Sequence, residues 1–269
     1  MAVVRCSIVA VSMCAAVSLH AWQPATNAGA ETALARMEAA YKTLPALHIK
    51  VRWSAKYSGG MSADDFPLPG PDSLELRMER PNKLYLSSAS KRDGKQSSYL
   101  IVSDGTTLTY WRSATNSFIQ KKGPTTLAGI ARLLPDTAIG VTIDNTWEAE
   151  SIAEWDLLAD DRTPAITKAA ATGGVLTMTG PERLGDAQVN VVRLTAPSGA
   201  LPIQIEQRLY LDVESYLLRG LATSARGKHP DTGRDFTVEM RAVYDVHTTQ
   251  PTFSADAFRF VAPRGARLQ

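Results

Sequence analysis

The stretch from Leu74 to Ile119 decides the fold of this chain, because it consists of short apolar runs separated by turn residues. The runs read LELRME (74–79), KLYL (83–86), YLIV (99–102) and LTYW (108–111). In the first run apolar residues alternate with charged ones, which predicts a strand with one buried and one solvated face. Arg80-Pro81-Asn82 and Asp104-Gly105 separate neighbouring runs as tight turns. Strands joined so closely form an antiparallel meander, and strand twist makes such a sheet curl.

Further strands and helices are predicted on both sides of this meander. A strand at about 47–57 precedes it, and strands at about 175–179, 187–195, 203–212, 216–223, 236–247 and 258–261 follow. Helices are predicted at about 31–44, 124–134 and 148–159 from apolar residues at spacings of three and four. We therefore expect an α+β fold, a curled antiparallel sheet of about ten or eleven strands. Such an incomplete β-barrel would need the N-terminal helix and the central helices to cover its open side.

The N-terminus has the composition of a secretory signal peptide. Arg5 supplies positive charge, residues 8–19 are mostly apolar, and small residues at Ala21 and at Ala28-Gly29-Ala30 offer two alternative cleavage sites. The apolar run is shorter than the roughly 20 residues that a membrane-spanning helix needs. We expect residues 1–30 to be the signal peptide and a disordered start, and residues 31–269 to form a single domain. Cys14 leaves lipid modification of the N-terminus as an open alternative.

The composition argues against several classes of function. Lys and Arg number 29 and Asp and Glu number 27, so the chain lacks the basic excess typical of nucleic-acid binding. Beyond the signal peptide, His48, His229 and His247 are too scattered for a zinc site. No nucleophile elbow, P-loop or dinucleotide fingerprint occurs. We expect no catalytic residue, no metal and no cofactor, although paired carboxylates such as Asp64-Asp65 keep a hydrolase open as an alternative.

Four segments resemble the LolA-like family of periplasmic carriers for outer-membrane lipoproteins. They are ERPNKL (79–84), VSDGTTL (102–108), LAGIAR (127–132) and FRFVAPRG (258–265), and they occur in the family's order. The resemblance implies an incomplete barrel in which helices form a lid over a cavity for acyl chains. It also implies that Arg80 is a latch that hydrogen-bonds the lid helices and holds the cavity shut. Leu84 and Leu86 stand where the carriers tend to have aromatic residues, and this chain is longer, which indicates a divergent member.

Pattern and resemblance together predict a periplasmic carrier without enzymatic activity that holds the acyl chains of a lipid or lipoprotein. The predicted lining of its hydrophobic cavity consists of Leu76, Met78, Leu84, Leu86, Leu108, Tyr110, Leu127, Ile130 and Leu134. A membrane-bound donor or acceptor protein is a further expected partner, nucleic acid is not, and a monomer is expected. One alternative is an envelope sensor or protein-interaction module on the same fold, and a hydrolase of envelope glycans or lipids is another.

Overall fold

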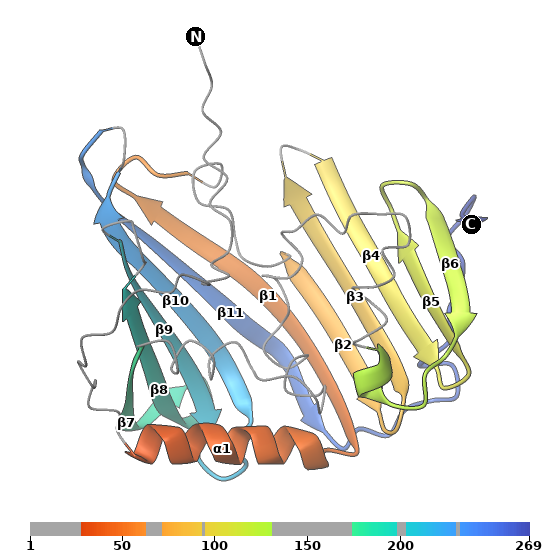
Figure 1. Ribbon diagram of the computed structural model, residues 1–269, viewed down its shortest axis with the longest axis horizontal. Helices are drawn as coiled ribbons and strands as arrows, with labels where there is room; N and C mark the ends of the chain where they lie inside the picture. Colours follow the sequence, from red (N-terminus) through yellow and green to blue (C-terminus); the bar gives the residue numbers. More distant parts are fainter. Residues whose placement is uncertain (1–27, 63–71, 93–94, 131–173, 198–202, 230–231) are drawn as a thin grey trace, which may run out of the picture.

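The computed structural model describes residues 28–62, 72–92, 95–130, 174–197, 203–229 and 232–269. Its strands form one sheet in the order β12-β6-β5-β4-β3-β2-β1-β11-β10-β9-β8-β7. The sheet curls without closing, since β12 and β7 each have a neighbour on one side only (Figure 1). An open, curled antiparallel sheet with an N-terminal helix is the architecture that the resemblance to the LolA-like family implied, so the resemblance is confirmed for the fold.

The sheet consists of two consecutive meanders and one short added strand. The first meander contains β1 (Ala46–Ser58), β2 (Ser73–Glu79), β3 (Lys83–Arg92), β4 (Lys95–Asp104), β5 (Thr107–Arg112) and β6 (Ser117–Lys122). The second contains β7 (Val175–Leu184), β8 (Ala187–Pro197), β9 (Ile203–Asp212), β10 (Leu218–Lys228) and β11 (Asp235–Thr249). The last strand, β12 (Arg267–Leu268), pairs in parallel with β6. The described residues thus form twelve strands in one sheet, close to the ten or eleven expected.

The two meanders join where β1 pairs with β11. The antiparallel register runs from Leu47 opposite Thr249 to Ser58 opposite Thr237, with a bulge between Lys50 and Val51. Because the two strands come from opposite ends of the described chain, this pairing places the two meanders side by side in one continuous sheet (Figure 1).

Helix α1 (Ala28–Thr43) lies across one end of this sheet and contacts β7 and β8 (Figure 1). Its buried stripe includes Leu34, Met37 and Tyr41, which join a core cluster with apolar residues of β1–β5 and β7–β11. Glu31 in the first turn suits the helix dipole, and Pro45 follows the last turn, where it stops the helix. We call the face that carries α1 and this cluster the concave face, and the opposite one the convex face.

The C-terminal segment differs from its predicted structure. Residues 258–261, in which Phe258 and Phe260 stand two apart, were expected to form a strand, but they are not in a strand. Phe258 is instead buried and meets Phe253 edge-on, with ring centroids 4.9 Å apart, and the Phe260 ring lies 5.0 Å from that of Phe118 on β6. The alternation therefore reflects packing of aromatic rings rather than strand pairing.

The helices differ from the prediction in their bounds and in how far they are described. Helix α1 begins three residues before its predicted start and ends one residue before its predicted end. In the predicted helix 124–134, helical backbone begins at Leu127 and continues to Ile130. Residues 124–126 are not helical, and residues 131–134 and the predicted helix 148–159 lie outside the described residues.

Candidate ligand-binding face

The residues predicted to line a cavity lie together on the concave face. The seven most buried of them are at most 5% exposed, and all belong to the core cluster beneath α1: Leu76, Met78, Leu84, Leu86, Leu108, Leu127 and Ile130. Tyr110 is half-buried and packs against this cluster, and burial raises its pKa to about 12. Leu134 lies outside the described residues. The sequence thus located one apolar wall, while the role of these residues as a cavity lining stays a prediction.

Half-buried aromatic and sulfur-containing side chains extend this wall. They pack against the cluster without being enclosed by it: Trp53, Tyr99, Met178 and Tyr244. A second apolar cluster follows along β10 and β11, formed by Ala225, Phe236, Val238 and Met240. The predicted strands 47–57 and 236–247 contain several of these residues, but the predicted site residues were confined to the first meander and the second helix.

Arg80 ties the first meander to the end of α1. Its Nε donates to the carbonyl of Leu44 at 2.9 Å, and one terminal nitrogen donates to the carbonyl of Tyr41 at 3.2 Å. The last carbonyls of a helix have no partner within the helix, and the five N–H groups of a guanidinium can reach two of them at once. The Arg80 backbone N–H also donates to Pro45 at 2.8 Å. The corner therefore holds the C-terminal end of α1 by three hydrogen bonds.

The same corner holds the start of the second helix. The Leu127 N–H donates to the Pro81 carbonyl at 2.9 Å. Asn82 Nδ2 donates to the carbonyls of Pro124 at 2.7 Å and Gly105 at 2.8 Å. These two bonds join the segment before the second helix to the turn between β4 and β5. Thr126 Oγ1 accepts from the Gly129 N–H at 3.1 Å, as a helix N-cap does. Arg80-Pro81-Asn82 thus connects two helices and two hairpins.

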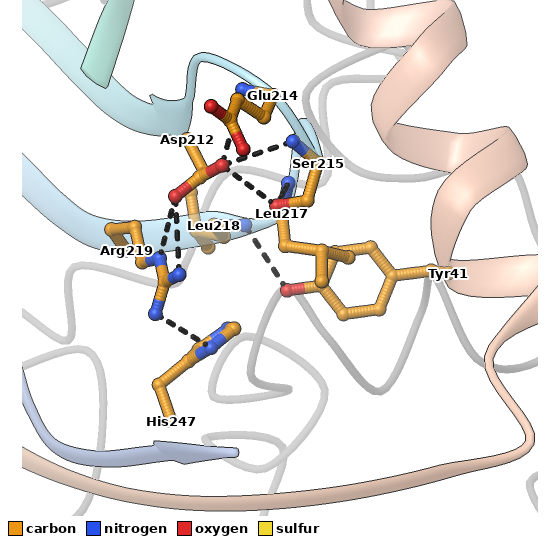
Figure 2. Close-up of polar contacts among 8 residues, drawn as sticks. All are labelled: Tyr41, Asp212, Glu214, Ser215, Leu217, Leu218, Arg219 and His247. Carbon is orange, nitrogen blue, oxygen red and sulfur yellow. Dashed lines mark hydrogen bonds and ion pairs between the residues drawn. The ribbon is translucent and has the colours of Figure 1, made fainter. Parts of the chain in front are cut away.

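A polar cluster lies beside Tyr41 where β9 turns into β10 (Figure 2). One Asp212 oxygen accepts two hydrogen bonds from Arg219, at 3.1 and 3.2 Å. Arg219 also donates to His247 Nδ1 at 3.1 Å, and the Tyr41 hydroxyl accepts from the Leu218 N–H at 3.3 Å. The guanidinium charge is therefore matched by the Asp212 carboxylate, and the histidine takes part as an acceptor.

This contact fixes the tautomer of His247. Arginine can only donate, so Nδ1 must be unprotonated and the neutral ring carries its proton on Nε2. Burial lowers the pKa of His247, and the nearby Arg219 charge lowers it further, to about 4. At neutral pH the ring is therefore uncharged, with an Nε2–H donor.

Two N–H donors on the concave face have no acceptor among the described residues. They are Nε2 of His247 and Nε1 of Trp53, and both atoms are buried. An unpaired buried donor costs about 1–3 kcal/mol relative to a paired one. The sequence indicated only that His247 and Trp53 lie in strands, since a missing acceptor is a property of three-dimensional packing.

A separate hollow of about 410 Å³ lies on the convex face. Val102 and Thr109 line it, and their chain neighbours Ile101 and Leu108 belong to the concave cluster. Phe253 and Phe258 of the C-terminal segment form its other side, together with polar residues such as Asp104 and Gln120. This hollow contains none of the residues predicted to line the cavity.

Two searches of the described residues gave no candidate. Within the ranges given above, no group of three or more His, Cys, Asp or Glu side chains is arranged to hold a metal ion. No helix in this part of the chain is both long enough and apolar enough to cross a membrane.

Solved structures similar to this chain include two mycobacterial proteins. The lipoprotein LppX of Mycobacterium tuberculosis is 13% identical, with a TM-score of 0.41 over 85% of this chain and 99% of that chain. LprF of Mycobacterium bovis is 12% identical, with a TM-score of 0.43 over 85% and 96%. The Pseudomonas aeruginosa MucA/MucB complex is 13% identical, with a TM-score of 0.35 over 87% and 62%.

Sequence comparisons give one match. No curated protein matches the chain. Residues 30–143 match the model of a family described as "Predicted periplasmic protein (DUF2092)", and this range includes α1, the first meander and the start of the second helix. Over these residues the chain therefore matches a family of predicted periplasmic proteins, in agreement with the localisation expected from its N-terminal sequence.

Proposed function

We propose that this protein is a periplasmic carrier that holds the acyl chains of a lipid or lipoprotein against the concave face of its sheet. The observation that carries the proposal is the apolar wall, made of two clusters, that both meanders contribute to one face of an unclosed sheet. In a closed barrel or a sandwich the apolar side chains of such a wall pack against the rest of the sheet. A curled sheet that is covered by helices can instead admit a ligand.

Burial of hydrocarbon supplies the driving force for binding in this proposal. Each methylene group removed from water contributes about 0.8 kcal/mol, so an acyl chain needs no charged partner to bind tightly. The half-buried side chains of Trp53, Tyr99, Met178 and Tyr244 provide adaptable contact surface, since thioether and aromatic groups pack against irregular apolar shapes.

Arg80 would serve as the latch between the wall and its covering helices. Its side chain supplies two hydrogen bonds to carbonyls at the end of α1, and each such bond contributes only about 1 kcal/mol net. Breaking both would loosen the C-terminal end of α1 at small cost, while the buried stripe of the helix keeps it on the sheet. A weak latch suits a carrier, which has to release its cargo as well as retain it.

Native mass spectrometry of the protein purified from a periplasmic extract tests the proposal. The expected result is a co-purifying lipid or acylated species that organic extraction removes, and binding of an apolar fluorescent probe by the extracted protein. The absence of both a co-purifying lipid and probe binding would contradict the proposal. A stoichiometric protein partner without lipid would instead support an envelope sensor or interaction module, and turnover in a broad hydrolase screen would support an enzyme.

A further inference from the structure

The two unpaired donors of the concave face lie along the joint between the two meanders. Trp53 is opposite Ala242, and Ile49 is opposite His247, in the β1–β11 register. Side chains of directly opposed residues lie on the same face of a sheet, and Ile49 and Ala242 both belong to the concave cluster. Tyr244 lies between the two donors, packed against the same cluster, and its ring centroid is 5.9 Å from that of His247. A short polar strip therefore interrupts the apolar wall.

This strip offers uncharged N–H groups as hydrogen-bond donors. Trp53 Nε1 is a donor only, and His247 presents Nε2–H because its Nδ1 accepts from Arg219. The one guanidinium in contact with the strip, that of Arg219, is already paired with Asp212. A phosphate or carboxylate would find no unmatched positive charge among these residues. A neutral oxygen acceptor fits the strip better.

We propose that His247 Nε2 and Trp53 Nε1 donate hydrogen bonds to carbonyl oxygens of the bound cargo. The ligand class is then an acyl ester or amide, such as a glyceride or an acylated lipoprotein terminus, rather than a bare hydrocarbon. This inference depends on the proposed function, because it assigns the polar part of the same cargo. It explains why two buried donors lack acceptors in a wall that is otherwise apolar.

The low pKa of His247 supports this role. A protonated ring would need acceptors at both nitrogens, while Arg219 requires Nδ1 to remain an acceptor. Burial and the Arg219 charge hold the pKa near 4, so the ring stays neutral from neutral pH down to mildly acidic values. Donation from Nε2 is therefore available throughout that range.

Competition for an apolar probe tests the inference. The extracted protein is loaded with N-phenyl-1-naphthylamine and titrated with dibutyl sebacate, a diester whose two carbonyls can lie about as far apart as the two donors, or with an alkene of the same chain length, each delivered from the same detergent. Two neutral hydrogen bonds predict that the ester competes about tenfold better than the alkene. Trp53→Phe, which keeps an aromatic ring but removes the N–H, should reduce this preference to about threefold. His247→Phe should act in the same direction, and both variants should keep their affinity for the alkene.

The controls separate this inference from the proposed function. His48→Phe removes a histidine from the convex side of β1, where it contacts Glu75, and should leave the ester preference unchanged. Equal competition by ester and alkene in the wild type, or a preference that is undiminished in a folded Trp53→Phe variant, overturns the inference while leaving a hydrocarbon carrier intact. If the wild type binds neither the probe nor either ligand, both the proposed function and this inference fail.

Discussion

His247 shows how one residue can make the stability of the fold depend on pH. Its ring is held neutral by burial and by a donor that occupies Nδ1. In the unfolded chain the pKa returns to about 6.5. Between these two values the unfolded chain binds a proton that the folded protein does not bind. The free energy of unfolding should therefore fall as the pH is lowered from about 6.5 to about 4.

The expected fall is roughly 3 kcal/mol, from a difference of about 2.5 in pKa at 1.36 kcal/mol each. His247→Gln cannot take up this proton, so the variant should lose most of the fall over that window. Urea unfolding at pH 7.0, 5.5 and 4.5, followed by circular dichroism, measures the dependence. His229→Gln, in the turn between β10 and β11, is the histidine control. An undiminished fall in His247→Gln would show that other groups cause it.

Arg80 is the residue on which the latch depends. Arg80→Leu removes the two hydrogen bonds to the end of α1 and should lower the free energy of unfolding by about 2 kcal/mol, with the fold retained. Release of a bound apolar probe into lipid vesicles should become faster, because the C-terminal end of α1 is held less firmly. Stopped-flow fluorescence measures the rate. Arg241→Leu, an exposed arginine on β11, is the matched control, and equal release rates in the two variants would contradict the latch.

At the scale of the elements, the turn after β1 depends on one glycine that approaches another strand. A Cβ on Gly59 would lie 2.1 Å from the carbonyl oxygen of Asp235, at the start of β11, whereas a Cβ on Gly60 would meet nothing within 4 Å. Both residues have positive φ, +71° and +87°, so alanine is strained at either position by about 1–2 kcal/mol. The contact with β11 is the difference between them.

Gly59→Ala should therefore destabilise the protein by at least about 1 kcal/mol more than Gly60→Ala. The extra loss arises because the β1–β11 pairing must shift to make room for the methyl group, while Gly60→Ala carries the backbone strain alone. Chemical denaturation of both variants gives the comparison. Equal losses would mean that the turn after β1 does not pack against β11 in solution.

Strands were predictable from the sequence where one face of the strand is buried and the apolar residues of that face alternate along it. The alternation of Leu74, Leu76 and Met78 predicted β2, and residues 203–212 predicted β9 at the bounds that the structure shows. Residues 258–261 misled because Phe258 and Phe260 alternate as strand residues do, while their rings pack on other rings instead. Alternation reports burial of one face, and it does not report whether the backbone finds a partner.

At the scale of the molecule, the sequence predicted a curled sheet but carried no signal for its central joint. Leu47 pairs with Thr249, and nothing local to either strand selects a partner so distant. The polar strip could not be predicted for the same reason, since Trp53 and His247 come together only through the pairing of β1 with β11. Most residues of the predicted lining lie together because their strands are neighbours in sequence. Residues that come together within one meander could thus be predicted from the sequence, whereas residues that come together between the two meanders could not.

The C-terminal segment extends from the central joint to the edge of the sheet. It leaves β11 near Gln250, whose N–H donates to Ala46, and it ends at β12 beside β6. Between these points Phe258 is 5% exposed, whereas Val261 is 71% exposed. The segment therefore links the middle of the sheet to its outer strand on the convex side, and Phe258 is the buried side chain that anchors it.

Phe258→Ala should destabilise the protein by about 3 kcal/mol through lost burial and the cavity left behind, while Val261→Ala should change stability by less than about 0.5 kcal/mol. Because the anchor holds β12 against β6, amide hydrogen exchange in residues 117–122 should become faster in Phe258→Ala than in Val261→Ala. Ester preference and probe affinity should remain as in the wild type, since the concave face is not touched. Unchanged exchange in β6 would show that this edge of the sheet is stable without the segment.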